Sequence, residues 1–133
     1  MKILVAEDEV VSRIKLVTIL ESLGRIEAVD NGRDAVTLFR KAWEEEEPFD
    51  LVCLDVSMPG LDGTEVLLEI REIESSLKVT REKPAKILMI TSHTDKDTII
   101  TSIQAGCDDY LIKPFQSDKV LDKVRRLGLK VTN

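Results

Sequence analysis

The chain has few of the residues that bind soft metals and no segment suited to cross a membrane. Its 133 residues include one histidine, His93, and two cysteines, Cys53 and Cys107. The cysteines lack the spacing of a metal site, so we expect reduced, mostly buried thiols in a cytosolic protein. No hydrophobic run approaches the roughly 20 residues of a membrane-spanning helix, and the N-terminus lacks a signal-peptide layout. We therefore predict a cytoplasmic protein that has neither a membrane segment nor a zinc site.

Acidic residues outnumber basic ones, 25 to 19. The formal net charge is −6 at pH 7, which argues against a surface that binds nucleic acid. The chain has no internal repeat and no low-complexity linker. Its length suits one domain with a proper core, so we expect a single domain over residues 1–133.

Five short hydrophobic runs alternate with five segments of helical periodicity. We predict strands over 3–6, 26–29, 51–54, 86–90 and 109–112, the second of them at an edge of the sheet. The first helix is expected to bury one face, made of Val10, Ile14, Val17, Leu20 and Leu23. A long polar loop is expected over 75–85, and Thr94 or Asp95 is expected to cap the fourth helix. This alternation predicts an α/β fold in which helices cover both faces of a parallel sheet.

Residues 51–63, LVCLDVSMPGLDG, form the central stretch. A short apolar strand, buried on both faces, brings Asp55 to its carboxyl end. Pro59, Gly60 and Gly63 then prevent the strand from continuing and delay the next helix until about residue 63. Ligands bind at this edge of an open parallel sheet. Taken alone, however, Asp55 is equally consistent with a residue that caps a turn.

The other strand ends carry polar residues as well. Glu7 and Asp8 follow the first strand, Thr91 the fourth and Lys113 the fifth. Singly, Lys113 is consistent with a surface lysine and Thr91 with a helix cap, but their shared position favours one site. Three clustered carboxylates stay ionised only beside a cation, and all-oxygen ligands suit Mg²⁺ or Mn²⁺. With an ammonium and a hydroxyl nearby, this set suits a transferring phosphoryl group, and Asp55 is the predicted nucleophile.

The combined residue set resembles the response-regulator receiver domain of two-component signalling along essentially the whole chain. The resemblance rests on Glu7-Asp8, on DVSMPGLDG around Asp55, on Thr91-Ser92 after ILMI, on Ala105-Gly106 before Asp108-Asp109-Tyr110, and on Lys113-Pro114-Phe115. Glu7 stands where aspartate is commoner.

The resemblance implies a flavodoxin-like, doubly wound sheet of five strands in the order 2-1-3-4-5, with five helices. It implies that Asp55 takes phosphate from a sensor histidine kinase or a histidine phosphotransfer protein. It further implies that Mg²⁺ is held by Glu7, Asp8, Asp55 and the backbone carbonyl of Ser57. The phosphoryl oxygens would be held by Thr91, Lys113 and the backbone amides of Ser57 and Ser92.

Three further surfaces or roles follow. Tyr110 falls at the switch-aromatic position of the family. The surface that signals to the downstream protein, called here the output face, is expected to comprise Ile99, Ile103, Gln104, Tyr110, Lys119 and Lys123. For the isoleucines, the alternative is plain packing in the core. The histidine donor is expected to dock on Glu9, Val11, Ser12 and Lys15, although the side of the helix that Val11 occupies is ambiguous. Ser57 and His93 flank the path of the hydrolytic water and are expected to tune phosphate lifetime, with a solvated loop residue as the alternative for His93.

Two other functions use similar residues. A haloacid-dehalogenase-type phosphatase requires a second aspartate two residues after the nucleophile, where this chain has Ser57. It also requires a cap domain that closes over a small substrate, and we expect none in this chain. A docking module that is never phosphorylated would not need the intact acid, threonine and lysine set. We expect a protein that catalyses only its own phosphorylation and dephosphorylation and acts on a downstream protein. It is expected to be a stand-alone receiver, monomeric or dimerising on phosphorylation, unless the chain is a fragment of a longer protein.

Overall fold

Five parallel strands form one sheet in the computed structural model, which describes residues 1–77, 84–92 and 96–131. Strands and helices alternate along the chain in the order β1 (Lys2–Ala6), α1 (Val10–Leu20), β2 (Arg25–Val29), α2 (Gly32–Glu44), β3 (Leu51–Asp55), α3 (Gly63–Ser76), β4 (Lys86–Thr91), α4 (Lys96–Gln104), β5 (Asp109–Ile112) and α5 (Ser117–Arg126). The strand order is β2-β1-β3-β4-β5 and every pairing is parallel. The predicted fold class and the edge position of the second strand are therefore confirmed.

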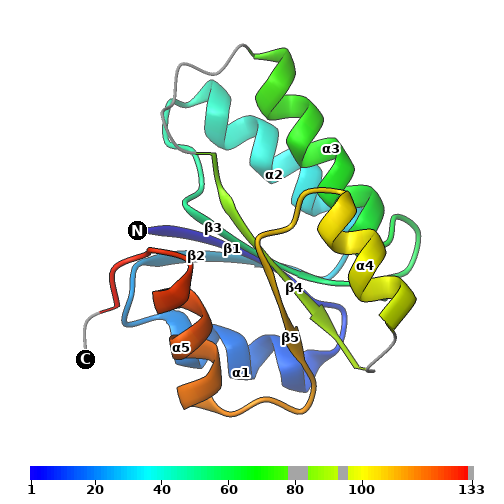
Figure 1. Ribbon diagram of the computed structural model, residues 1–133. Helices are drawn as coiled ribbons and strands as arrows, with labels where there is room; N and C mark the ends of the chain where they lie inside the picture. Colours follow the sequence, from blue (N-terminus) through cyan, green and yellow to red (C-terminus); the bar gives the residue numbers. More distant parts are fainter. Residues whose placement is uncertain (78–83, 93–95, 132–133) are drawn as a thin grey trace.

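Helices cover both faces of the sheet. Figure 1 shows α1 and α5 on one face and α2, α3 and α4 on the other. Because successive side chains of a strand point to opposite faces, each central strand contributes to both cores. In β1, Ile3 and Val5 join the core under α1 and α5, whereas Leu4 and Ala6 join the core under α2 and α3.

The turn from β3 into α3 places Asp55. All five residues of β3 are buried. Asp62 caps α3 in a reciprocal capping box with Glu65, which satisfies backbone donors at the start of the helix. A Cβ at Gly63 would lie 2.2 Å from the carbonyl oxygen of Asp55. Only glycine therefore lets α3 begin directly against the end of β3, beside the candidate nucleophile.

The predicted buried face of α1 is partly wrong. Leu20 and Leu23 are buried as expected, but Val10 is 56% exposed and Ile14 is 60% exposed. The face that meets the sheet carries Ser12, Leu16 and Leu20, at a spacing of four residues. Helix α1 is apolar on several sides, so periodicity alone allowed two faces. Leu16 and Leu20 fill the core, Val17 is half-buried, and Val10 and Ile14 lie on the surface.

The remaining expectations concern loops, cysteines and membranes. Helix α3 continues to Ser76, two residues into the expected loop, and the expected caps Thr94 and Asp95 lie outside the described residues. Both cysteines are free; Cys53 is buried, which raises the pKa of its thiol to about 12, and Cys107 is half-buried.

Among the described residues, none of the helices has both the length and the apolar character needed to span a bilayer. The cytoplasmic location stays a prediction.

Candidate functional site

The carboxyl ends of the strands bring three acidic side chains together. Asp55 is the last residue of β3, and Glu7 and Asp8 directly follow β1. One carboxylate oxygen from each lies within 4.8 Å of one from each of the others. Glu7 is fully buried and Asp55 is 4% exposed, whereas Asp8 is exposed. The predicted acidic cluster is thus present, open to solvent on the side of Asp8.

Lys113 is the cation of this cluster. Its Nζ donates to Glu7 Oε1 at 2.7 Å and to Asp55 Oδ2 at 3.4 Å. Burial alone would lower the pKa of Lys113, but its hydrogen bond to Glu7 and the charges of Asp55 and Glu7 raise that pKa above its ordinary 10.5. The Lys113 ammonium is therefore charged throughout the physiological pH range.

The Asp55 carboxyl group has a raised pKa. Burial, reinforced by the Glu7 carboxylate, raises the pKa of Asp55 from its ordinary 3.8 to about 7, although the Lys113 ammonium and the backbone N–H of Ser57 lower it. That N–H donates to Asp55 Oδ1 at 3.3 Å. One ammonium facing three acids leaves excess negative charge, which a bound cation would offset.

The donor set fits a hard divalent cation. Glu7 Oε2 is buried and accepts no hydrogen bond from the described residues. A buried carboxylate oxygen needs a partner, and a cation would supply one. Three carboxylates beside an open, solvated edge suit the all-oxygen, partly hydrated coordination of Mg²⁺. No described cysteine lies in the cluster, so its ligands are not those of a structural zinc site.

The other predicted phosphate-binding residues flank the cluster. Thr91 ends β4 and is 7% exposed, and its carbonyl oxygen accepts from the backbone N–H of Lys113 at 2.8 Å. The side chains of Ser57 and Ser92 are exposed. His93, predicted to tune hydrolysis, lies outside the described residues.

One contributor to the site was missed from the sequence. Arg13 of α1 donates from Nη1 to the backbone oxygen of Glu7 at 2.9 Å and to that of Asp8 at 3.5 Å. It therefore braces the loop that carries the acid pair. An arginine on the second turn of a helix looks like a solvated residue in sequence, and only the path of the preceding loop reveals this contact.

The surface on which the histidine donor is expected to dock is only partly exposed. Val11 is 73% exposed and Glu9 is exposed, but Ser12 is buried and donates to Glu9 Oε1 at 2.6 Å. The ambiguity about Val11 is resolved in favour of the surface. Lys15 is half-buried, and its ammonium donates to the backbone oxygen of Phe115.

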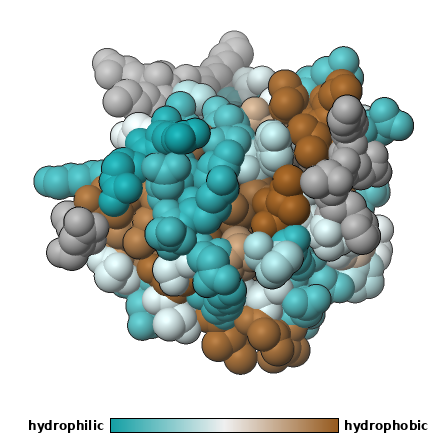
Figure 2. Space-filling model, turned by 60° about the horizontal axis from the view of Figure 1, so that its bottom comes forward, coloured by the Kyte–Doolittle hydropathy of each residue, from teal (hydrophilic) through white to brown (hydrophobic). Residues whose placement is uncertain are grey.

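A groove of about 410 Å³ runs from this end of α1 to the site, lined by Glu9, Val11, Ser12, Lys15, Ser92, Lys113, Pro114 and Phe115. Figure 2, in which the lower part of Figure 1 comes forward, shows hydrophobic side chains gathered at the lower edge of the molecule. Helix α1 exposes Val10, Val11 and Ile14. Exposed apolar side chains beside a groove suit a protein partner.

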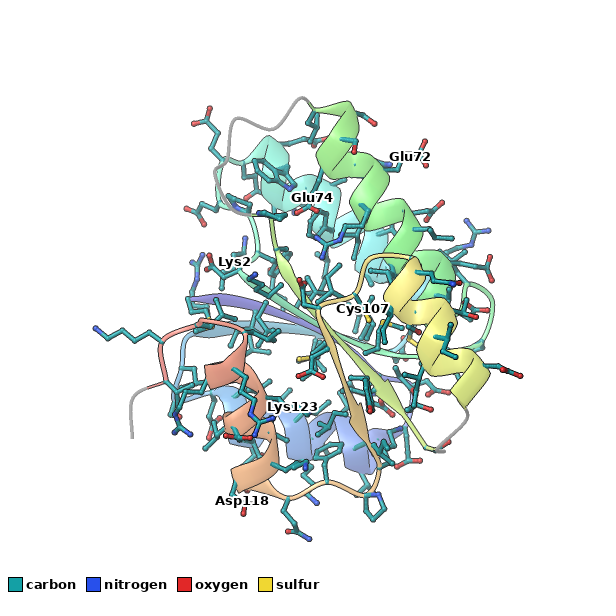
Figure 3. The ribbon with its side chains drawn as sticks, in the orientation of Figure 1. Lys2, Glu72, Glu74, Cys107, Asp118 and Lys123 are labelled. Carbon is teal, nitrogen blue, oxygen red and sulfur yellow. The ribbon has the colours of Figure 1, made fainter. Side chains whose placement is uncertain are left out.

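The expected output face combines exposed and engaged side chains. Ile103, Gln104 and Lys119 are exposed, whereas Ile99 and Tyr110 are half-buried. Lys123 extends from α5 toward β5 (Figure 3), where its Nζ donates to Asp109 Oδ1 at 3.0 Å. The same Nζ lies 5.1 Å from the centre of the Tyr110 ring. Tyr110 is therefore held by a cation in this conformation.

Comparison with known sequences identifies the family. Residues 3–125 match the response regulator receiver domain. The chain is 32% identical over 127 residues to the chemotaxis protein CheY of Bacillus subtilis (strain 168), with 94% of this chain and 95% of that protein aligned. It is 35% identical over 127 residues to the transcriptional regulatory protein ResD of the same organism; the alignment covers 95% of this chain but only 47% of ResD. The chain thus spans about half of that longer relative.

Solved structures agree with this assignment. A chain of the CheX–CheY–BeF3–Mg²⁺ complex from Borrelia burgdorferi superposes with a TM-score of 0.82 at 25% identity, covering 98% of this chain and 90% of that one. A second match is to the co-crystal structure of the Saccharomyces cerevisiae histidine phosphotransfer protein Ypd1 with the receiver domain of Ssk1. Its TM-score is 0.80 at 26% identity, with 96% of this chain and 88% of that one covered. Sequence, fold and strand-end site agree, and the chain belongs to the receiver domain family of response regulators in two-component and phosphorelay signalling.

Proposed function

We propose that Asp55 is the phosphoacceptor of this receiver domain and that its donor is a phosphohistidine. One observation carries the proposal: the Asp55 carboxylate lies at the end of β3, 3.4 Å from the Lys113 ammonium and within 4.8 Å of the Glu7 and Asp8 carboxylates. A carboxylate at a strand end, beside an ammonium and two further acids that could hold a metal ion, suits phosphoryl transfer.

The transfer needs an ionised Asp55. A carboxylate oxygen of Asp55 attacks the phosphorus in line with the bond to the donor imidazole. The new O–P bond forms as the N–P bond breaks, and the imidazole keeps the electron pair and takes up a proton from water. Lys113 offsets the negative charge of the product, and Thr91 and the backbone N–H groups of Ser57 and Ser92 donate to phosphoryl oxygens.

Glu7, Asp8, Asp55 and the backbone carbonyl of Ser57 would hold the divalent cation, Mg²⁺ or alternatively Mn²⁺. When bound, the cation neutralises charge on the transferring phosphoryl group. Ser57 and His93 are proposed to tune hydrolysis of the aspartyl phosphate, because in the sequence they stand two residues after Asp55 and two residues after Thr91.

The donor is a sensor histidine kinase or a histidine phosphotransfer protein, and it docks on α1. Val11 and Glu9 are the exposed members of the predicted surface, and the groove beside them leads to Lys113. The co-crystal of Ypd1 with the Ssk1 receiver supports a phosphotransfer partner for a domain of this fold. Output passes to a downstream protein through α4, β5 and α5, with the domain acting as a monomer or as a phosphorylation-dependent dimer.

Phosphorylation by acetyl phosphate tests this function without requiring a partner protein. With Mg²⁺ present, we expect the intact protein to gain the mass of one phosphoryl group. Asp55→Asn should not gain it, whereas Asp122→Asn, a matched change at a carboxylate 3.1 Å from Arg126 on α5, should label like the parent. Labelling that persists in Asp55→Asn, or its absence from the parent, would contradict the proposal.

The same experiment separates the two alternatives. A docking module would not label at all. A haloacid-dehalogenase-type phosphatase would release phosphate from many substrates, and the match to the receiver family over residues 3–125 removes the main support for that function.

A further inference from the structure

Lys15 joins α1 to the loop between β5 and α5. Its Nζ donates to the backbone oxygen of Phe115 and lies 5.1 Å from the centre of the Phe115 ring. Phe115 is 3% exposed and belongs to the core beneath α1 and α5. The Lys15 ammonium therefore makes both a hydrogen bond and a cation–π contact with Phe115, which lies 100 positions further along the chain.

This loop carries Lys113. On the side of β4, the backbone N–H of Lys113 donates to the carbonyl oxygen of Thr91 at 2.8 Å. Two residues later, the Phe115 carbonyl is held by Lys15. The backbone on both sides of the lysine side chain is thus fixed, once by the sheet and once by α1.

The position of the Lys113 ammonium depends on this backbone. A lysine side chain has four rotatable bonds, and here its ammonium has two anionic partners, Glu7 at 2.7 Å and Asp55 at 3.4 Å. A shift of the loop would let the ammonium keep its shorter contact with Glu7 and lose the longer one with Asp55. Small displacements of catalytic groups have large effects on rate.

We propose that Lys15 is a positioning residue for phosphoryl transfer: it holds Phe115, and thereby keeps Lys113 within reach of Asp55. This role rests on the proposed function of Asp55 as the phosphoacceptor. It differs from the docking role expected from the sequence, because the partner of the Lys15 ammonium is a backbone oxygen of its own chain.

Acetyl phosphate separates the two roles, since it needs no docking surface. Lys15→Met keeps the aliphatic stem and removes both the charge and the donor. We expect it to phosphorylate about three- to thirtyfold more slowly than the parent, with unchanged affinity for Mg²⁺, because Glu7, Asp8 and Asp55 are untouched. Lys15→Arg should restore most of the rate, because a guanidinium also donates to a carbonyl and stacks on a ring. Lys41→Met, at a lysine 66% exposed on α2, should behave like the parent.

A double-mutant comparison identifies the route of the effect. In a Lys113→Ala background, Lys15→Met should cause no further loss of rate, because the group that it positions is absent. An equal loss in both backgrounds would overturn the proposal. So would a normal rate with acetyl phosphate combined with a slower rate from a phosphohistidine protein, which would leave Lys15 as a docking residue only.

A third measurement is independent of phosphorylation. Without any phosphodonor, NMR of Lys15→Met should show changed side-chain shifts of Lys113 and faster hydrogen exchange at residues 113–116, while urea unfolding confirms that the variant is folded. Unchanged Lys113 shifts would refute positioning even if the parent proved unable to accept phosphate. Failure of the parent to label at Asp55, with the Lys113 shifts changed, would instead refute the proposed function alone.

Discussion

The Lys113 ammonium lies 2.7 Å from the Glu7 carboxylate, closer than the 3.4 Å that separates it from the Asp55 carboxylate. Glu7 is fully buried, so this ion pair is shielded from solvent screening. Asp55 shares the same ammonium at a longer distance. Its carboxylate is therefore only partly compensated without a metal ion, and this imbalance has consequences for stability.

Asp55→Asn should stabilise the metal-free protein at pH 8. The pKa of Asp55 rises from 3.8 to about 7 on folding, so the folded state binds more protons than the unfolded state between about pH 4 and pH 7. Stability contributed by the protonated form is lost as the pH rises through this window. Removing the charge should therefore raise the free energy of unfolding by about 1 to 3 kcal/mol at pH 8 and by less at pH 5.

Urea unfolding in a chelator measures this difference, with Asp122→Asn as the control for loss of a surface carboxylate. An Asp55→Asn variant whose gain in stability is as large at pH 5 as at pH 8 would show that Asp55 is ionised throughout this range.

Arg13→Met should weaken Mg²⁺ binding about tenfold, the lower end of the loss that follows removal of a group that orients metal ligands. Arg13 donates to the backbone oxygens of Glu7 and Asp8, and its loss frees the loop that carries both. Calorimetric titration with Mg²⁺ gives the affinity, and Lys41→Met controls for loss of a surface cation. Equal affinities in Arg13→Met and the parent would assign Arg13 no part in the site.

Lys123→Met should shift Tyr110 toward its activated position before any phosphate is added. We expect phosphorylation to draw Thr91 toward the phosphoryl group and Tyr110 to turn inward. The cation over the Tyr110 ring opposes that turn. A contact of this kind contributes about 0.5–1 kcal/mol, so its loss should enrich the inward population about two- to fivefold.

NMR shifts of the Tyr110 ring test this, with the parent in beryllofluoride and Mg²⁺ as the activated reference and Lys119→Met on the same helix as the control. The switch would be refuted if beryllofluoride moved only resonances near the acidic cluster.

Val11→Ala should impair transfer from a phosphohistidine protein while leaving acetyl phosphate labelling unchanged. Val11 is 73% exposed beside the groove, and alanine keeps the helix. We expect a three- to tenfold loss in kcat/KM for the protein donor, about the effect of trimming a contact residue. Leu68→Ala, at a leucine 53% exposed on α3, is the matched control. The same loss in both variants would mean that α1 is not the docking surface.

Much of this site can be predicted from the sequence, because the residues that end each strand are recognisable from the local residue pattern. An apolar run followed by Asp55, Pro59 and Gly63 marks where β3 ends, and parallel topology brings such ends to one edge. The acid cluster and Lys113 therefore follow from strand boundaries and residue type. The strand order itself came from the resemblance to receiver domains, and the sheet confirms it.

The contacts of α1 could not be read in this way. Its apolar residues allow two buried faces, and the choice depends on which side chains fill the space above β1 and β2. Ser12 is buried although serine usually lies at the surface. Arg13 and Lys15 donate to backbone oxygens. Every residue has a backbone oxygen, so the residue type of the acceptor does not predict such a contact.

Asp55 is the group that we expect to carry phosphate, and locating the phosphoryl group on the chain tests this most directly. The protein is treated with acetyl phosphate and Mg²⁺, the acyl phosphate is reduced with borohydride, and the peptides are sequenced by mass spectrometry. We predict reduction to homoserine at position 55 alone, dependent on Mg²⁺. A reduced residue at any other acid, or unmodified Asp55 in a folded, Mg²⁺-loaded protein, would show that Asp55 is not the phosphoacceptor.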